Sequence, residues 1–345
     1  METLPIHPVD RALAPEIKRA LDNKTKPVDS LGRLESYGAK IALIQKSTTP
    51  RLISETIVLF AGDHGITQEK VSAYPSEVTR QMVYNFMEGG AAINGFCKTG
   101  DIRLLLVDSG VRGDPFPPPV LNRKIGPGTK SFLNSPAMDD NEYRKAVAAG
   151  SQIIDDLVAK GVNTVGFGEM GIGNSSAAAI ITSEILDLPI AAVTCRGTGL
   201  SDDELACKIS ILEESKKKHG LICDSHGLLQ TYGGYEMAMM CGAMLQACAQ
   251  GLTVVVDGFI CSAVALCCYK MDPNCRDYFI LSHASKSKGY KHIAAALDLT
   301  PVLDLEMGLG EGTGAALCLP ILRSACSILT HMASFEQAGL SGRHK

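Results

Sequence analysis

One carboxylate is set among glycines near the end of the chain, in the segment Gly308-Leu309-Gly310-Glu311-Gly312-Thr313-Gly314. The apolar run that follows, residues 313–335, predicts one long helix, so Glu311 would lie beside the N-terminus of that helix. The positive end of a helix dipole stabilises an ionised carboxylate, and an accessible carboxylate can take a proton from a substrate. Glu311 is therefore either a general base or only a helix cap, and its own segment does not identify the proton.

A second glycine-rich segment, Gly166-Phe167-Gly168-Glu169-Met170-Gly171, follows an apolar run and precedes a helical pattern that begins near Asn174. Glycines let a backbone approach a phosphate, and a helix N-terminus offers unpaired N–H groups. A dinucleotide site would also need an acid at the end of the next run, which instead reads Val193-Thr194-Cys195. The segment favours a mononucleotide phosphate over NAD, and a purely structural turn stays open. Because a carboxylate repels phosphate, Glu169 would address another part of the ligand.

A third glycine-rich segment, Cys195-Arg196-Gly197-Thr198-Gly199-Leu200, is followed by a helical pattern that carries Lys208. Arginine and lysine beside glycine loops are common counter-charges for phosphate. Taken alone, Arg196 could equally be a solvated loop residue and Lys208 a surface lysine.

The segment after the first apolar run pairs Asp63 with His64 and continues to Tyr74, Met82 and Phe86. An Asp-His pair could serve as a general base or bind a metal, but no other His or Cys has matching ligand spacing, so no metal is expected. Tyr74, Met82 and Phe86 could line a flat apolar pocket for an aromatic substrate. The alternative that they belong to an ordinary core is the more common case.

These residues need elements that position them, and six short apolar runs predict a sheet. The runs are Thr56–Ala61, Arg103–Val107, Asn163–Phe167, Pro189–Thr194, Thr253–Val256 and Tyr278–Leu281. Their continuous apolarity is typical of parallel strands buried on both faces. Helical patterns alternate with them, at Tyr143–Lys160, Ser175–Leu186, Asp203–His219 and Gly234–Gln250. The chain is therefore predicted to be an α/β protein with a doubly wound, mostly parallel six-stranded sheet.

Polar residues follow the ends of these runs: Asp63, His64, Asp108, Glu169, Arg196, Asp257, Ser282 and His283. In open α/β sheets, ligands bind outside the carboxyl ends of the strands, so we expect these side chains to face one cleft. For Asp108 and Asp257 the alternative is that each carboxylate only caps a helix.

The two ends of the chain contain no strand pattern. The first 50 residues predict helices at about Ala12–Asp22 and Leu31–Ser47. We expect residues 1–50 and about 313–345 to form a small helical domain beside a large nucleotide-binding domain of about 51–312. The proline-rich region Gly110–Ala137 predicts an irregular excursion.

Composition narrows the classes of partner. The 345 residues carry 33 basic and 37 acidic side chains, a formal net charge of -4, which gives no field to attract nucleic acid or an anionic membrane. The most apolar stretch, Val254–Cys268, is interrupted by Asp257, and no secretion signal precedes it. Most of the 12 cysteines sit among apolar residues, as reduced core thiols do. We expect a cytoplasmic protein with a small-molecule substrate.

Together the segments resemble the nicotinate-nucleotide:dimethylbenzimidazole phosphoribosyltransferase family, which makes the lower-ligand nucleotide of cobamides. The matching stretches, in family order, are Ser30-Leu31-Gly32-Arg33-Leu34-Glu35, Gly62-Asp63-His64-Gly65, Val71-Ser72-Ala73-Tyr74-Pro75, Gly168-Glu169-Met170-Gly171-Ile172-Gly173-Asn174, Asp257-Gly258-Phe259, Ser282-His283 and Leu309-Gly310-Glu311-Gly312-Thr313-Gly314. The combination is far more specific than any one motif.

The resemblance implies a Rossmann-like large domain, a small helical domain from both termini, and a dimer. It implies transfer of phosphoribose from nicotinate mononucleotide to an aromatic base, giving an α-ribotide and nicotinate without metal or cofactor. Glu311 matches the base that takes the nucleophile's proton, and Glu169 matches an assisting acid. The residues assigned to the nucleotide and its phosphate are Gly171, Gly173, Asn174, Arg196, Gly197, Lys208, Asp257, Ser282, Gly310 and Gly312. Those assigned to the base pocket are Tyr74, Met82, Met170 and Phe86.

Three departures accompany the resemblance. Val28-Asp29 stands where the family often has Pro-Gly, Cys195 replaces a glycine, and Gly308 stands where an arginine is common. Some relatives work as heterodimers and accept phenol or p-cresol, so the acceptor and the choice between homodimer and heterodimer stay open. Two other functions are weighed: a catalytically silent partner subunit, which retention of Glu169 and Glu311 disfavours, and a nicotinamide-dependent oxidoreductase, which the missing ribose acid disfavours.

Overall fold

The computed structural model describes residues 5–197 and 199–341. At the centre of this part of the chain lies one six-stranded sheet in which every neighbouring pair is parallel, in the order β3-β2-β1-β4-β5-β6. The strands are β1 (Thr56–Gly62), β2 (Arg103–Gly110), β3 (Leu121–Asn122), β4 (Thr164–Met170), β5 (Thr253–Val256) and β6 (Phe279–Leu281). The predicted α/β fold with a six-stranded parallel sheet is confirmed.

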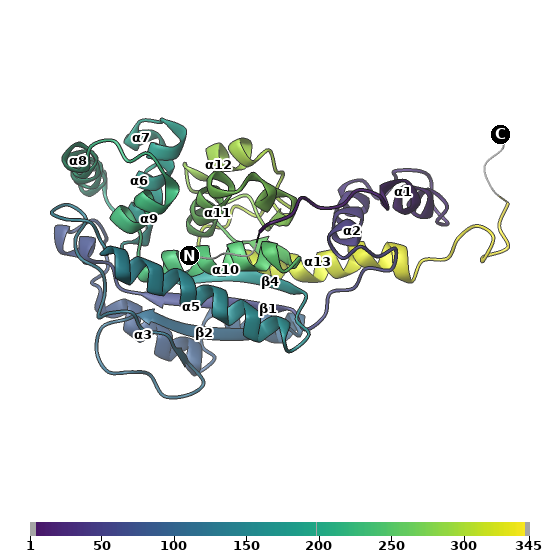
Figure 1. Cartoon of the computed structure of the whole chain (residues 1–345), viewed down its shortest axis with the longest axis horizontal. Coiled ribbons are helices and arrows are strands. Elements are labelled where there is room, and N and C mark those ends of the chain that lie inside the picture. Colours follow the sequence, from purple (N-terminus) through teal and green to yellow (C-terminus); the bar gives the residue numbers. More distant parts are fainter. Residues whose placement is uncertain (1–4, 198, 342–345) are drawn as a thin grey trace.

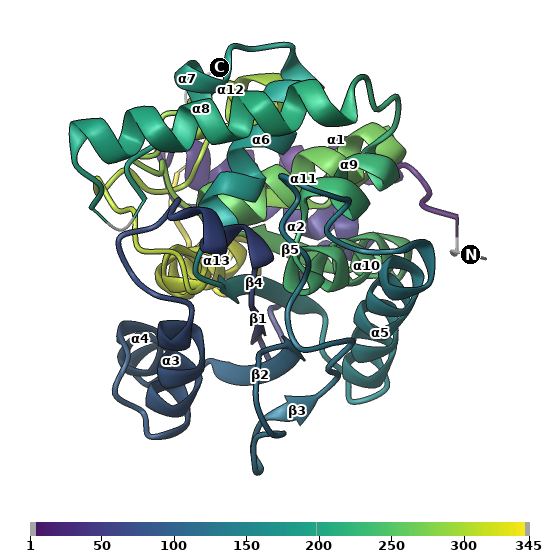
Figure 2. The same cartoon turned by 90° about the vertical axis from the view of Figure 1, so that its left-hand side faces the viewer.

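Helices cover both faces of the sheet (Figure 2). Along β1, Val58 and Phe60 pack into the core under α5 (Asp140–Val158) and α10 (Tyr235–Ala249). Ile57 and Leu59 point the other way, toward α3 (Glu77–Met87), α4 (Ala92–Gly100) and α13 (Thr313–Thr330). Both faces of the sheet are buried under helices, which is why the strands are continuously apolar. The remaining elements are α1 (Ala14–Asp22), α2 (Arg33–Ile44), η1 (Gly65–Glu69), α6 (Asn174–Leu186), α7 (Ile190–Val193), α8 (Asp202–His219), α9 (Ser225–Tyr232), α11 (Phe259–Met271), η2 (Pro273–Asp277) and α12 (Tyr290–Leu297).

One predicted strand is wrong. The run Pro189–Thr194 forms the short helix α7, which packs against α6 and α8 and does not join the sheet. A short apolar run has the same pattern in a buried helix as in a buried strand. The sixth strand is β3, which lies inside the region Gly110–Ala137 that was expected to be irregular. It pairs with β2 through only two residues, Leu121 and Asn122.

The helices from the two ends of the chain pack together, away from the centre of the sheet (Figure 1). Ile17 and Leu21 of α1 and Ala42 of α2 share a small apolar cluster with Ile328 and Leu329 of α13. The last helix ends at Thr330, five residues before the predicted limit. Residues 1–4 and 342–345 of the predicted helical domain lie outside the described residues, and the proposed division into two domains stays a prediction.

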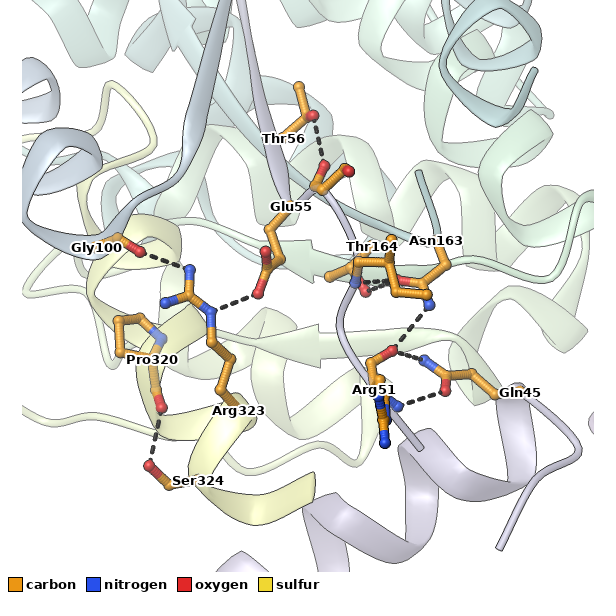
Figure 3. A network of polar contacts seen from close by, with 12 residues as sticks. Gln45, Arg51, Glu55, Thr56, Gly100, Asn163, Thr164, Pro320, Arg323 and Ser324 are labelled. Atoms are coloured by element: carbon orange, nitrogen blue, oxygen red, sulfur yellow. Dashed lines mark hydrogen bonds and ion pairs between the residues drawn. The ribbon is translucent and has the colours of Figure 1, made fainter. Parts of the chain in front are cut away.

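The C-terminal helix is fixed to the start of the central strand, at the edge opposite the strand carboxyl ends. Arg323 of α13 pairs with the buried Glu55 and donates to the carbonyl of Gly100 over 2.6 Å (Figure 3). In the described part of the chain α13 is the one helix long and apolar enough to cross a membrane, yet most of it is buried inside the protein. It has the character of a core helix in a soluble protein.

Candidate active site

The glycine-rich segment that carries Glu311 lies against the carboxyl end of β4. Three consecutive residues, Gly310, Glu311 and Gly312, have positive φ angles of 87°, 62° and 79°. Glycines adopt this backbone without strain, which explains their place on both sides of the acid. A Cβ atom built on Gly312 would lie 3.2 Å from Cα of Gly168, so the loop packs closely on the strand.

Asp257, at the end of β5, holds this loop and the start of α13. Its Oδ2 accepts a hydrogen bond from the backbone N–H of Gly312, and its Oδ1 accepts one from that of Ala315, each over 3.1 Å. The carboxylate is fully buried, and Nδ1 of His283 lies 3.6 Å from its Oδ1. One oxygen of Asp257 is therefore engaged by the loop that presents Glu311, and the other by the first turn of α13.

The environment makes Glu311 a stronger base than an ordinary carboxylate. Burial, followed by the nearby charge of Asp257, raises the pKa of Glu311 to about 7. The residue is buried, with 7% of its surface exposed. A carboxylate with a pKa near neutrality can take a proton from a weak nucleophile. This base strength fits the role predicted for Glu311.

Glu169, the residue after Gly168 on β4, lies beside the same loop. A Cβ atom added to Gly310 would collide with Oε1 of Glu169, so the two segments are in direct contact. Burial raises the pKa of Glu169 well above its usual range, against a hydrogen bond from Asn174, and the neighbouring acids Asp257, Glu236 and Glu311 raise it further. The structure thus brings together the two predicted catalytic acids, with Asn174 fixing one of them.

A candidate anion site lies at the N-terminus of α6. Gly173 caps the helix with φ 99°, and the N–H groups of Asn174 and Ser176 donate to the carbonyls of Gly171 and Gly173 over 3.0 Å and 2.9 Å. Nζ of Lys208 lies 3.0 Å from Oγ of Ser175, and a Cβ atom built on Gly197 would lie 3.8 Å from the same Nζ. Lys208 is 1% exposed, burial lowers its pKa, and no carboxylate of the described residues forms an ion pair with it. A buried cation at a helix N-terminus is suited to binding phosphate.

Other predicted site residues lie apart or are engaged elsewhere. The guanidinium of Arg196 donates to the carbonyl of Leu200 over 2.8 Å and pairs with the exposed Asp202. Ser282 is fully buried, and its Oγ lies 3.1 Å from Nδ1 of His283. Both side chains therefore bond to other groups of the protein, whereas the sequence predicted that they face an open cleft.

Asp108, near the end of β2, is another residue that was expected to face the cleft. Its Oδ1 accepts the N–H of Val111 over 2.9 Å, and its Oδ2 lies 3.4 Å from Nζ of Lys124. The carboxylate thus stabilises a local turn after β2 and does not cap a helix, which was the alternative considered for this residue.

The residues predicted to line the base pocket divide into two groups. Phe86 and Met170 are buried in the apolar cluster under the carboxyl ends of β1 and β4, and Met82 is half-buried against it. Tyr74 stands 52% exposed on the loop before α3. Oγ1 of Thr79 accepts the backbone N–H of Ile172 over 3.0 Å and so ties α3 to the loop after β4. The apolar wall thus adjoins Glu169, with Tyr74 exposed outside the buried cluster.

One polar contact near the site was not predicted. Nε2 of His64 lies 2.5 Å from Oε1 of Glu236, and both side chains are buried. The sequence suggested that His64 is a general base or a metal ligand, and no local pattern connects it with an acid 172 positions away. The available signal was the single carboxylate in the otherwise apolar helix α10. No group of three or more His, Cys, Asp or Glu residues in the described ranges has the arrangement of a metal site.

Comparisons with known proteins agree with this arrangement. A family model described as a phosphoribosyltransferase matches residues 6–340. The nicotinate-nucleotide–dimethylbenzimidazole phosphoribosyltransferase of Cupriavidus taiwanensis is 44% identical over 337 residues, 97% of each chain. That of Photobacterium profundum is 43% identical, over 94% of this chain and 96% of the relative. A crystal structure of the enzyme with this name from Thermus thermophilus superposes with a TM-score of 0.91 at 39% identity, covering 97% of this chain and 100% of that one.

Proposed function

This chain belongs to the nicotinate-nucleotide–dimethylbenzimidazole phosphoribosyltransferase family, and from that premise we propose that it transfers phosphoribose from nicotinate mononucleotide to dimethylbenzimidazole in cobamide synthesis. The products are nicotinate and an α-ribotide. The observation that carries the proposal is Glu311, which lies against Gly168 and Glu169 at the carboxyl edge of the sheet and whose pKa is raised to about 7.

The chemistry needs a base at the acceptor. The bond between the anomeric carbon of ribose and the pyridine nitrogen breaks, and its electron pair stays on nicotinate. A ring nitrogen of the acceptor forms the new bond from the opposite face and loses its proton. Glu311 takes that proton, and the electron pair of the broken N–H bond stays on the acceptor, which leaves the base of the ribotide neutral.

Glu169 and the α6 N-terminus would bind the rest of the nucleotide. Lys208 and the N-terminus of α6, which Gly173 caps, would contact the phosphate. Glu169 keeps its proton to higher pH than an ordinary acid because of burial. In that form its carboxyl group can donate a hydrogen bond to the ribose without repelling the phosphate.

Finer points extend the proposal. Met82, Phe86 and Met170 form an apolar wall that would contact a flat base, and phenol or p-cresol remain alternative acceptors beside dimethylbenzimidazole. We expect a cytoplasmic dimer, formed by two copies or with a related chain, and a small helical domain from the two chain ends. A non-catalytic partner subunit is the competing function, and the retained pair Glu169 and Glu311 argues against it.

Mass spectrometry of the reaction products tests the proposal. The purified chain is incubated with nicotinate mononucleotide and, in separate reactions, dimethylbenzimidazole or phenol. We expect an α-ribotide of dimethylbenzimidazole and an equal amount of nicotinate. Product from phenol alone would correct the acceptor. No product from either acceptor, with or without a related chain added, would refute the transferase assignment.

A further inference from the structure

The carboxylate of Asp257 bonds to other parts of the chain on every side. Asp257 follows the last residue of β5, and it accepts the N–H of Gly312 in the catalytic loop and that of Ala315 in the first turn of α13. A Cβ atom added to Gly314, between these two donors, would collide with the ring of His283 and with Asp257 itself. The carboxylate is thus enclosed by α13 on one side and His283 on the other, with no face open to a ligand.

The neighbouring residue types invite a different interpretation. Ser282, His283 and Asp257 have the composition of a hydrolase triad, but the geometry does not support that function. In a triad, the two ring nitrogens of histidine contact serine and aspartate separately. Here Ser282 Oγ and Asp257 Oδ1 both approach Nδ1 of His283, at 3.1 Å and 3.6 Å. All three side chains are buried, so no substrate reaches the hydroxyl.

We propose that Asp257 is a positioning residue for the transferase reaction: it fixes the loop that presents Glu311 and holds a negative charge behind that loop. The inference rests on the proposed function, because it assigns Asp257 a task in the same reaction. It replaces the direct nucleotide contact that the sequence suggested for this residue. Two separate observations support it, the hydrogen bonds to the loop and to the first turn of α13, and the charge placed behind the loop.

The charge effect has a defined direction. Both oxygens of Asp257 accept N–H donors at a helix N-terminus, which favours the ionised form although burial raises its pKa. The ionised Asp257 raises the pKa of Glu311 beyond the effect of burial. Other titratable groups surround the pair from each packed element: Glu169 of β4, Glu236 of α10, His283 after β6, Tyr290 of α12, Cys261 of α11 and Cys318 of α13. Removing the charge of Asp257 should therefore make Glu311 a weaker base.

The variant Asp257→Asn tests the inference, because it keeps the shape of the side chain and removes its charge. The midpoint of the acid limb of kcat/KM should move to lower pH by about half a unit or more. At pH about 8, kcat should fall roughly tenfold or more, since the base is weaker and the loop loses one acceptor. KM for nicotinate mononucleotide should stay within about threefold of the wild-type value.

Two results would overturn it. A uniform loss of kcat with an unchanged midpoint would mean that Asp257 is only structural. A raised KM with unchanged kcat would mean that it binds the nucleotide. Asp108→Asn is the matched control, because Asp108 is also buried at a strand end and accepts a backbone N–H, but that of Val111 outside the catalytic loop. It should keep the wild-type midpoint.

A measurement without substrate separates this inference from the proposed function. The pH dependence of the stability difference between wild type and Glu311→Gln reports the pKa of Glu311 directly. Repeated in the Asp257→Asn background, its midpoint should again move to lower pH, and an unchanged midpoint would contradict the inference even if no ribotide is ever formed. If Asp257→Asn does not fold, Asp257→Ser serves, since its hydroxyl can still accept one N–H and carries no charge.

Discussion

The backbone of Glu311 rests directly on Gly168, the residue that precedes Glu169 on β4. A Cβ atom built on Gly168 would lie 2.7 Å from the carbonyl carbon of Glu311 and 2.8 Å from the nitrogen of Gly312. Any larger residue at position 168 would therefore displace the loop. The contact explains how two acids that are 142 positions apart in the sequence (311 − 169) come to share one site.

Gly168→Ala should separate the two acids. The methyl group pushes the loop away from β4, and a misplacement of this size lowers kcat by about 100-fold. Binding of nicotinate mononucleotide should change less, because Lys208 and the start of α6 are not displaced. Steady-state kinetics on the purified variant check this. Gly95→Ala on α4 is the control, because nothing lies within 4 Å of its added Cβ, and it should keep wild-type kcat. Equal kcat values for the two variants would contradict the predicted geometry.

Glu311→Gln should stabilise the fold above neutral pH. The pKa of Glu311 is raised from 4.5 to about 7 in the folded state, so the folded protein holds this proton more tightly than the unfolded chain. The resulting stability is complete below pH about 4.5 and is lost as the pH rises through about 7. Gln has no proton to lose.

Thermal melting at two pH values measures this effect. After allowance for solvent screening, the variant should gain roughly 1–2 kcal/mol relative to wild type at pH about 8 and little at pH about 5. A gain of the same size at both pH values would mean that the pKa of Glu311 is not raised.

Lys208→Met should weaken nucleotide binding without unfolding the protein. Met fills a similar volume and removes a buried charge whose hydrogen-bond partner, among the residues that the structure describes, is the Ser175 hydroxyl. Loss of a charged hydrogen bond to phosphate should raise KM for nicotinate mononucleotide by about 10- to 100-fold, with a smaller change in kcat. Lys216→Met on the same helix, where Lys216 pairs with Glu184, should leave KM unchanged. Equal KM values for wild type and Lys208→Met would remove Lys208 from the phosphate site.

Arg323→Met should lower the free energy of unfolding by removing contacts that lie far from the candidate active site. It leaves the buried Glu55 without its cation and the carbonyl of Gly100 without a donor. Because Arg323 is partly exposed, the expected loss is roughly 1–3 kcal/mol in denaturant unfolding. The double variant Glu55→Gln with Arg323→Met should recover part of this loss. If the single variant unfolds at the wild-type denaturant concentration, the ion pair does not anchor α13.

The sequence predicted the elements that follow local rules. Buried parallel strands are continuously apolar, so five of the six strands were located, and glycines beside Glu311 and Glu169 marked the two loops that meet. The apolar run Pro189–Thr194 misled because length and apolarity do not distinguish a short helix from a strand. The two-residue strand β3 exists only through its pairing with β2, which no local pattern encodes.

Long-range partnerships in the site were beyond the sequence patterns. Asp257 was considered as a cap for the helix that follows it, and a nucleotide contact was assigned to it from family resemblance. In the structure its carboxylate accepts the N–H groups of Gly312 and Ala315, at the start of α13, 55 and 58 positions later. The partner of His64 is Glu236 on α10, which lies 172 positions later in the sequence. Such contacts depend on how the helices pack around the sheet, and only the folded chain defines them.

The single-turnover rate of Glu311→Gln is the most direct test of the proposed mechanism. Enzyme in excess over nicotinate mononucleotide is mixed with dimethylbenzimidazole at pH about 8, and ribotide is followed with time beside wild type. Loss of a general base should slow the chemical step by about 100- to 10,000-fold, while nicotinate mononucleotide still binds with near wild-type affinity. A rate within about threefold of wild type would show that Glu311 does not take the acceptor's proton.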